Sequence, residues 1–525
     1  MNKLRKTALL LLVLTCLLQA VQFPASAAGN TPAVSMAELH PEQYGFRLIR
    51  SQETGSGQLY QLEHTKSGAA VAYLDNGSKR LEFSFGFRTP PEDNKGANHV
   101  LEHSLLCGSQ KYPTKNLMSY LRANSVADLI NAFTADDCTY YAFKTKNQKD
   151  FYNLMDVYLS SVLHPLILED ENIFKQQGIR REYADGKAQY NGVVYNELRL
   201  RNLDSDESAL YTTSDLLYQS LYGNTRPTLN SGGTPEAILD LTYEDVLRVY
   251  RTYYTPSNSI LYLAGDQDMP RTLALFDQYL QGFERQEVQI SWEDTLQMPE
   301  TRLITQDVTE ETQTVDIGFM TAGCAVYDRL ACHANSVITA MIDQELRKRW
   351  PIIYTTGGGT GGIFNTSLII SNVPIDQKDE VIAAYHQTAE ALAQALPPQE
   401  ELNQAIDSTF SWTDESEDML TESGILDGFV YRNDPFSMLD YQSGVQALKE
   451  QPQYLTELLN QFYVDSPYQV TAVVGHRQKD TEAGFLSVTP EELEQIRKDT
   501  EAFWAWADTP DPQTVIDAIP ALDLE

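Results

Sequence analysis

The protein is a chain of 525 residues, of which 42% are hydrophobic and 21% are charged. This composition excludes a wholly disordered, collagen-like or coiled-coil protein, and the length predicts two or three domains. Acidic residues outnumber basic ones by 73 to 39, giving a formal net charge of −34. Nucleic acid is therefore excluded as a partner class, because phosphate binding needs a basic face.

The N-terminus has the pattern of a targeting segment. Three basic residues within positions 3–6 precede an apolar run over 7–18, and Ala-Ser-Ala at 25–27 supplies small residues for cleavage. We expect residues 1–28 to be a signal peptide and the protein to be exported, either extracellular or in the cell envelope or periplasm. The apolar run is short for a transmembrane helix, and no membrane span is expected after signal removal.

The first half of the mature chain predicts strands followed by helices. A strand is expected over 68–74, and apolar residues alternate with polar ones over 81–88, which predicts a strand with one buried face. The stretch 128–146 is β-like, and 259–264 is a short apolar strand. Helices are expected over 97–106, 149–163, 168–184, 192–201, 213–221 and 242–253, and from 265 to about 283.

The second half repeats this mixture of elements. Strands are expected over 314–320, 363–371 and 470–474, and Thr489-Pro490 begins a helix with a capping box. Further helices are expected over 328–350, 377–395, 399–410 and 452–463.

A faint internal duplication divides the chain. The strand motifs SILYLAG and QVTAVVG end at Gly265 and Gly475, which are 210 residues apart, and each follows an amphipathic helix. The predicted fold class is α+β, with two homologous domains, each a mostly antiparallel sheet packed with helices. We expect a catalytic domain over 29–290, a non-catalytic homologue over 300–490, and a C-terminal helix with a linker-like tail over 491–525.

The sharpest chemical signal is the motif His99-Val-Leu-Glu102-His103. On a helix, residues at i and i+4 lie on one face about one turn apart, so both imidazoles can bind one tetrahedral cation. Glu102 lies beside them and could accept a proton from a water that a metal has made more acidic. The pattern is HxxEH, the inverse of HExxH. The alternative is a polar helix face with two unrelated histidines.

A catalytic zinc site needs a third protein ligand. The other histidines occur in no comparable pattern, so a carboxylate is favoured, although spacing alone cannot choose among so many acids. Glu197 in GVVYNE, at the start of a predicted helix, is a candidate. By itself it would be interpreted as a surface glutamate.

Several ordered sequence blocks resemble one peptidase family. Together they resemble the inverzincin metallopeptidases of the pitrilysin/insulinase family (M16), and are most similar to its presequence protease branch. The resemblance is strong over about 60–265 and weak after 300. The blocks are HVLEHSLLCGSQKYP (99–113), NAFTADDCTYYAFKTKN (131–147), GVVYNE (192–197), SGGTPEAILDLTYE (231–244) and YYTPSN (253–258).

The resemblance implies a role for each matching residue. His99 and His103 would be zinc ligands with Glu197 as the third, and Glu102 would be the general base, with one Zn²⁺ per chain. Glu182, on the predicted helix before Glu197, matches an acidic position that supports the site, with a plain surface glutamate as the alternative.

A candidate substrate strand also follows from the resemblance. Asn131, Ala132, Phe133 and Thr134 would form a sheet-edge strand that pairs with an extended peptide. An ordinary core strand is the alternative.

Two features depart from the branch pattern. Gln176-Gln177-Gly178 replaces the usual acid before the glycine, which affects residues around the site and not the ligands. The glycine-rich run 357–362 lacks the Lys-Ser/Thr of a Walker loop, so we expect a flexible loop there.

The resemblance covers only a first half, because presequence protease relatives are roughly twice as long. Residues 508–525 resemble the linker between their two halves. The prediction is a zinc metalloendopeptidase that hydrolyses extended or unstructured peptides with Glu102 activating a zinc-bound water. The alternative is a peptide-binding subunit or half-enzyme that is inactive without a partner chain. We expect a second half-enzyme chain as partner, with a homodimer less favoured.

Overall fold

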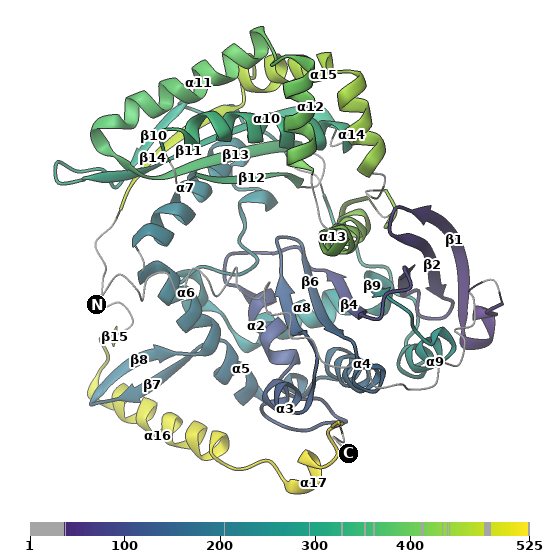
Figure 1. The fold of residues 1–525 in the computed structure, drawn as a ribbon. Coiled ribbons are helices and arrows are strands. Elements are labelled where there is room, and N and C mark those ends of the chain that lie inside the picture. The colour runs from purple at the N-terminus through teal and green to yellow at the C-terminus, as the bar shows by residue number, and fades with distance from the viewer. Residues whose placement is uncertain are drawn as a thin grey trace.

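The protein is a mixture of helices and sheets, which confirms the predicted α+β class (Figure 1). The predicted signal peptide lies outside the residues that the structure describes. The computed structural model describes residue 36 and residues 38–203, 205–292, 295–326, 329–350, 353–360, 363–410, 414–432, 434–437, 439, 441–476 and 485–522.

A seven-stranded sheet forms the centre of the first unit. Its order is β1-β2-β3-β9-β4-β6-β5, and the β-like stretch 128–146 is the hairpin of β5 and β6. Strands β1 and β2 were not predicted; the side chains of β1 are mostly exposed at the sheet edge, so no apolar alternation marks it. The strands are β1 (Phe46–Thr54), β2 (Gly57–His64), β3 (Ala70–Asp75), β4 (Leu81–Arg88), β5 (Leu129–Thr134), β6 (Cys138–Thr145) and β9 (Ser259–Ala264).

Most helices of the first half lie close to the predicted positions, although α7 begins at Ser205, eight residues before the predicted start at 213. Helix α8 begins with the capping box of Thr242 and Asp245, as its acidic first turn indicates. The unpredicted α3 is short. The helices are α2 (Ala97–Leu105), α3 (Leu117–Asn124), α4 (Gln148–Leu163), α5 (Glu171–Gln177), α6 (Val193–Leu203), α7 (Ser205–Tyr222), α8 (Tyr243–Tyr253) and α9 (Met269–Leu280).

The prediction of one helix over 168–184 is wrong. Helix α5 ends at Gln177, and the chain then forms a hairpin of β7 (Arg180–Ala184) and β8 (Lys187–Asn191), which β15 (Phe485–Leu486) extends. The turn residues Asp185 and Gly186 have φ of 49° and 81°. An Asp-Gly pair at positive φ is a preferred two-residue hairpin turn, and it is the signal that sequence analysis missed. Glu182 therefore lies on a strand and not on a helix.

The second unit has a five-stranded sheet in the order β10-β14-β11-β13-β12. The prediction of a flexible glycine-rich loop is wrong for 357–360, because these residues form the end of β12 and pair with β13; 361–362 lie outside the described residues. The strands are β10 (Leu303–Gln306), β11 (Thr314–Val326), β12 (Ile353–Thr360), β13 (Ile363–Pro374) and β14 (Gln469–Gly475).

The second half adds helices of its own, of which α13, α14 and α17 were not predicted. The predicted helix 452–463 is α15 up to Leu458, and it continues as a π-helix, η8 (Leu459–Val464). The helices are α10 (Arg329–Arg347), α11 (Lys378–Gln394), α12 (Gln399–Thr409), α13 (Asp414–Arg432), α14 (Tyr441–Glu450), α15 (Gln453–Leu458), α16 (Pro490–Ala507) and α17 (Gln513–Ile516).

The two sheets share one topology over five strands. In the first sheet, β9 lies between β3, to which it is parallel, and β4, to which it is antiparallel. In the second sheet, β14 lies between parallel β10 and antiparallel β11 in the same way. The order β3-β9-β4-β6-β5 thus matches β10-β14-β11-β13-β12. We propose on this basis that the two units are copies of one fold.

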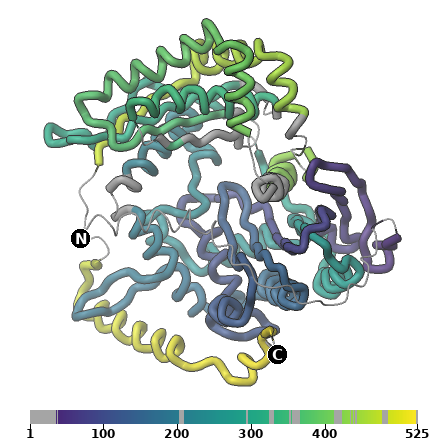
Figure 2. The backbone as a smooth tube through the Cα atoms, in the orientation of Figure 1, coloured from purple at the N-terminus to yellow at the C-terminus, as the bar shows by residue number. Residues whose placement is uncertain are grey.

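The units exchange one helix each (Figures 1 and 2). Helix α7 of the first unit packs on the second sheet, and α13 of the second unit packs on the first sheet. The buried residues at the α7 contact are Leu217, Leu221, Tyr222, Met320, Ala322, Ile369, Val470 and Ala472. Those at the α13 contact are Leu59, Ala72, Leu74, Ile260, Tyr262, Ala264, Ile425, Leu426, Phe429, Val430 and Phe436. Each unit therefore completes the core of the other.

A glycine on a central strand permits each close approach. A Cβ on Gly318 of β11 would lie 2.5 Å from Thr213 Cγ2 and 2.9 Å from Leu217 Cδ1 of α7. A Cβ on Gly86 of β4 would lie 3.0 Å from Leu426 Cδ2 of α13. Any larger side chain on these strands would hold the helices away from the sheets.

The C-terminal helix α16 returns to the first unit. The Arg180 guanidinium lies 4.1 Å from the ring centroid of Phe503, and the backbone N–H of Tyr183 donates a 2.9 Å hydrogen bond to Thr500 Oγ1. Strand β7 is therefore held by α16, and the described part of the C-terminal region, 491–522, packs on the first unit.

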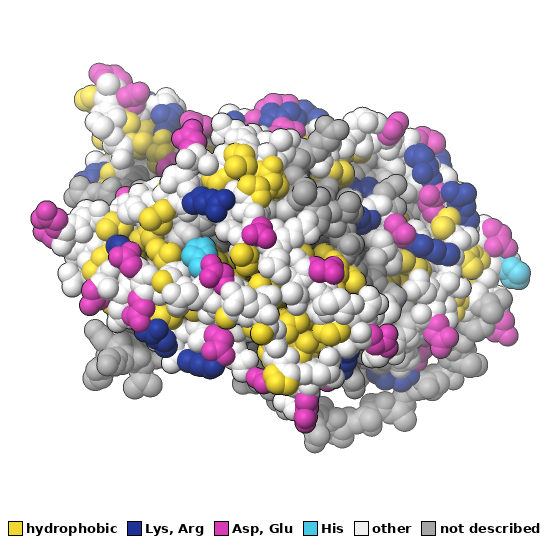
Figure 3. Space-filling view, turned by 90° about the horizontal axis from the view of Figure 1, so that it is seen from above, with side chains coloured by type: hydrophobic (Ala, Val, Ile, Leu, Met, Phe, Trp, Pro, Cys, Tyr) yellow, Lys and Arg dark blue, Asp and Glu magenta, His cyan; other side chains and the backbone are white. Residues whose placement is uncertain are grey.

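The surface reflects the acidic composition. Asp and Glu side chains are scattered over the face seen from above and are mixed with Lys and Arg (Figure 3). None of the helices in the described ranges combines the length and the apolar character that a membrane crossing requires.

Candidate metal centre

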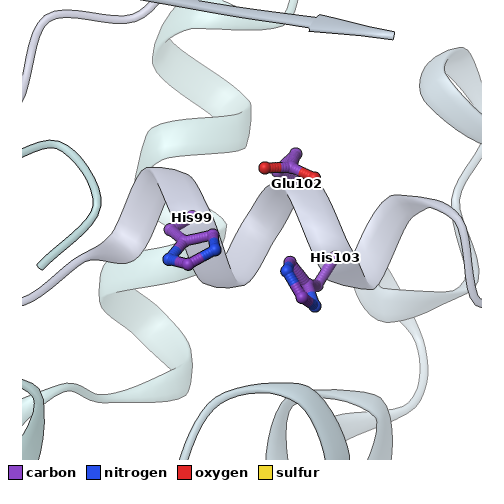
Figure 4. Close-up of side chains that lie close together, drawn as sticks. All are labelled: His99, Glu102 and His103. Atoms are coloured by element: carbon purple, nitrogen blue, oxygen red, sulfur yellow. The ribbon is translucent and has the colours of Figure 1, made fainter. Parts of the chain in front are cut away.

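Helix α2 places the two histidines of the HxxEH motif side by side. The imidazole ring centroids of His99 and His103 are 4.9 Å apart, as expected for positions one turn apart. Val100, Leu101 and Leu105 of the same helix are fully buried in the core. This packing fixes α2, and because positions i and i+4 share one face of a helix, both imidazoles point to the same side (Figure 4).

Helix α6 brings Glu197 to both imidazoles. Glu197 Oε2 lies 3.6 Å from His99 Nε2 and 3.8 Å from His103 Nε2. Ligand atoms about 2.1 Å from a tetrahedral zinc ion are themselves about 3.4 Å apart. The three side chains therefore approach the spacing of a zinc site. The ligand atoms of His99, Glu102 and His103 also lie within 4.8 Å of one another.

Two glycines set the start of α6. A Cβ on Gly192 would lie 2.1 Å from the carbonyl oxygen of Gly178, so only glycine allows the two loops to touch. The backbone N–H of Tyr195 donates a 3.4 Å hydrogen bond to that same carbonyl, and Val194 is fully buried. These contacts fix the first turn of α6 beside α5, which places Glu197 over α2.

The loop 230–233 orients His99. His99 Nδ1 lies 3.0 Å from the carbonyl oxygen of Gly232, so Nδ1 carries the proton and donates, which leaves the Nε2 lone pair free. Burial, followed by the neighbouring His103, lowers the pKa of His99 to about 4. The imidazole is therefore neutral at physiological pH, the form that binds a metal. Gly232 was not predicted as a site residue, although it lies in a block that carries the family resemblance.

Glu102 has a different environment from Glu197. Its carboxylate lies on another side of α2 from the imidazoles (Figure 4), and Thr134 Oγ1 donates a 2.9 Å hydrogen bond to Glu102 Oε2. Glu102 is buried, whereas 41% of the Glu197 side chain is exposed. Burial raises the pKa of Glu102, so its carboxylate is a stronger base than a surface glutamate.

Strand β5 is one of the two edge strands of the first sheet and lies beside α2. It carries the predicted substrate-binding residues Asn131, Ala132, Phe133 and Thr134. Its other neighbour is β6, and Tyr158 OH donates a 3.2 Å hydrogen bond to the Asn131 carbonyl. An edge strand offers backbone groups to another extended chain.

Glu182 does not contact the histidines. Glu182 Oε1 accepts a 3.0 Å hydrogen bond from Asn191 Nδ2, and Arg180 donates to its other oxygen. Asn191 Oδ1 in turn accepts 2.8 Å hydrogen bonds from the Gly192 N–H and from Asn196 Nδ2. Glu182 therefore supports the turn into α6, one step removed from Glu197. Asn191 was not predicted.

The departure at Gln176 and Gln177 also lies beside the site. Gln177 Nε2 is 3.1 Å from Cys107 Sγ, just beyond the end of α2. The two glutamines therefore pack against the end of the helix rather than against the candidate ligands.

Two family descriptions match the chain. Residues 75–210 match the model of "Insulinase (Peptidase family M16)", and residues 240–409 match that of "Peptidase M16 inactive domain". The first range includes all four candidate site residues on α2 and α6.

Two curated relatives illustrate the extent of similarity. Protein HypA of Clostridium perfringens is 27% identical over 521 residues, covering 92% of this chain and 53% of HypA. The mitochondrial presequence protease of Eremothecium gossypii is 38% identical over 264 residues, covering 49% of this chain and 26% of that protein. The chain thus spans about half the length of HypA, and its match to the presequence protease is confined to about a quarter of that protein.

Solved structures share the fold. A Helicobacter pylori protease matches with a TM-score of 0.61 at 15% identity, over 81% of this chain and 98% of that one. Pitrilysin matches with a TM-score of 0.58 at 14% identity, over 87% of this chain and 50% of pitrilysin. The first half of the periplasmic protease PqqL from Escherichia coli matches with a TM-score of 0.58 at 15% identity, over 86% of this chain and 96% of that one.

Proposed function

Because the chain belongs to peptidase family M16, we propose that it is a zinc metalloendopeptidase that hydrolyses extended or unstructured peptides. The observation that carries the proposal is the position of Glu197 Oε2, 3.6 Å and 3.8 Å from the two histidine Nε2 atoms. Glu102 lies close to them but is hydrogen-bonded elsewhere, to Thr134. This division supports separate roles for the two glutamates.

His99, His103 and Glu197 are the residues that would hold the metal. Two neutral imidazoles and one carboxylate are a common ligand set for a catalytic zinc ion, which keeps one position open. The His99 Nδ1 contact to the Gly232 carbonyl directs Nε2 toward Glu197. Glu182 would stabilise the start of α6 through Asn191.

Zinc, when bound, supplies Lewis-acid chemistry that makes water more acidic and polarises the peptide carbonyl. Glu102 accepts the proton that the attacking water loses and then delivers it to the leaving amine nitrogen, so the carboxylate is regenerated. The Thr134 hydroxyl holds this carboxylate in place throughout. The C–N bond breaks, and a new carboxyl group and amine result.

The edge strand β5 would hold the substrate. A peptide added to β5 would form backbone hydrogen bonds independent of sequence, which suits extended or unstructured substrates. Residues 131–134 end at Thr134, so a peptide paired with them would pass Glu102. The same strand would thus bind the peptide and orient the base.

A second chain would complete the enzyme. The chain spans about half of HypA, and PqqL includes a first half of similar fold. We favour a second half-enzyme chain over a homodimer. Without such a partner this chain would act as a peptide-binding subunit or inactive half-enzyme. We also propose that the protein is exported, to the cell envelope or beyond.

The test is cleavage of long unstructured peptides by the purified chain, with and without a chelator, across a range of protein concentrations. Turnover that a chelator abolishes and zinc restores supports the proposal, and chelator-insensitive turnover contradicts it. Turnover that is independent of concentration in a chain shown to be monomeric by its mass in solution would contradict the need for a partner. Rescue of a nearly inactive chain by a second protein would support it.

A further inference from the structure

A cavity of about 350 Å³ opens beside the candidate metal centre. Asp136 lies in its wall, two residues beyond Thr134 at the end of β5. Asn230 also lies in the wall, two residues before Gly232, whose carbonyl accepts the hydrogen bond from His99. Two residues of extended chain span at most roughly 7 Å. The cavity therefore adjoins the place where a peptide bound along β5 would be cut.

Among the residues that the structure describes, the wall of the cavity carries more negative than positive charge. Asp137 is 1% exposed, and its carboxylate is paired with Arg226 and accepts a 2.8 Å hydrogen bond from Tyr431 OH. The other oxygen of Asp137 is buried and has no hydrogen-bond partner among the described residues. Asp136 and Asp215 also line the cavity and are exposed, and Arg226 is the cation among the described residues that line it.

The pKa values agree with a shortage of positive charge. Desolvation, and then the charge of Asp137, raises the pKa of Asp136. Desolvation, and then Glu236, raises the pKa of Asp215 to about 6. Solvent reaches both carboxylates, but the surrounding walls remove part of their hydration. A cation entering the cavity would stabilise the charged form of both side chains.

The geometry favours an organic cation over a metal ion. Within the described part of the chain, three potential metal ligands converge within 4.8 Å at the HxxEH motif, and the cavity acids form no such group. The volume falls at the small end of the range of about 300–1,000 Å³ for ligand pockets. Tyr211 and Tyr218 add aromatic walls, against which a guanidinium can stack.

We propose that this cavity is a specificity subsite that accepts an arginine or lysine side chain of the peptide substrate, close to the scissile bond. Asp136 and Asp215 would pair with the cation, and the two tyrosines would stack on a guanidinium or contact the aliphatic stem of the side chain. Arg226, held by Asp137, would keep the wall rigid. The inference rests on the proposed function, because it assigns the cavity to a peptide lying along β5.

The test uses unstructured peptides that differ only in the position of one arginine, with glutamine in its place as the neutral reference. Two measurements are made on the full mature chain: kcat/KM of the native protein with zinc, and the affinity of the Glu102→Gln variant by fluorescence anisotropy. Arginine at one position should improve both by about tenfold over glutamine. The double variant Asp136→Asn with Asp215→Asn should lose this preference.

Asp240→Asn is the matched control, because Asp240 is an exposed acid outside the cavity wall. It should retain the preference, which separates the subsite from general attraction by an acidic surface. An equal arginine preference in the double variant would overturn the subsite. Failure of the native chain to cut any peptide would contradict the proposed function alone, because the binding measurement on Glu102→Gln still decides whether the cavity selects arginine.

Discussion

Thr134 Oγ1 donates a 2.9 Å hydrogen bond to Glu102 Oε2, which joins the edge strand β5 to the helix that carries the candidate ligands. Replacing Thr134 with Val keeps the side-chain shape and the backbone but removes the donor. We expect kcat to fall about tenfold, corresponding to about 1.4 kcal/mol for one hydrogen bond to a charged group. Thr134→Ser should retain activity near the native value. Equal kcat in the Val and Ser variants would show that the bond does not orient Glu102.

The roles of the two glutamates can be separated by metal analysis. Glu102→Gln should retain about one zinc per chain and lose most turnover, because the base is not expected to be a ligand. Glu197→Ala should lose the metal as well, as should His99→Ala. Glu182→Gln serves as the comparison, since Glu182 contacts Asn191 and not the histidines. Full zinc content in Glu197→Ala would remove Glu197 from the ligand set.

The cysteines are expected to be free thiols that react slowly in the native protein. Cys107 and Cys138 are free cysteines in the structure. Burial raises the pKa of Cys107 to about 12, so almost no thiolate forms at pH 8. Burial raises the pKa of Cys138 as well. Thiol titration without reductant should find four thiols in the denatured mature chain, with at least these two unreactive until unfolding. Two or fewer thiols would indicate a disulfide.

Lys144 holds two buried carboxylates together between the units. Its Nζ lies 2.9 Å from Glu82 Oε2 and 3.1 Å from Glu422 Oε2 of α13. Lys144→Met leaves both acids without this cation, and the free energy of unfolding should fall by about 3 kcal/mol in urea titrations. The exposed pair of Lys79 and Asp266 offers a control, since Lys79→Met should cost under about 1 kcal/mol.

The loss in free energy of unfolding that Lys144→Met causes, called the deficit below, should depend on pH. Burial raises the pKa of Glu422 above its ordinary value and the charge of Lys144 lowers it, so removing Lys144 raises this pKa further in the native state of the variant. Protonation thus favours the native state of the variant, and its deficit relative to the native protein should shrink between pH 7 and about pH 5. A deficit that stays constant over this range would place the cause in packing rather than in charge.

The exchange of helices between the units can be tested at Gly318. Valine at this position would clash with Thr213 and Leu217, because a Cβ there lies within 2.9 Å of both side chains. We expect Gly318→Val to lower the free energy of unfolding by about 3 kcal/mol or more as α7 is pushed from the sheet. Gly282→Val is the control, since a Cβ there meets nothing within 4 Å. If Gly318→Val has the same free energy of unfolding as the native protein, then α7 can shift away from the sheet without destabilising the fold.

Local patterns determined much of the fold before any tertiary contact was known. The alternation over 81–88 predicted β4, and Thr242, followed by acids in the next turn, predicted the start of α8. Both features arise from interactions between residues that are only a few positions apart, so they can be predicted from the sequence alone. Elements without a local pattern were missed: β1 exposes most of its side chains.

The candidate site divides in the same way. The HxxEH spacing alone placed His99 and His103 on one face of a helix, because the α-helical repeat is local. Only the tertiary structure brought Glu197 to 3.6 Å from His99, through the contact of Gly192 with Gly178, and only it gave Glu102 its hydrogen bond from Thr134. Both contacts join segments that are far apart in the chain. The distances between their atoms depend on how whole helices and strands pack together, and the spacing of residues along the sequence does not determine that packing.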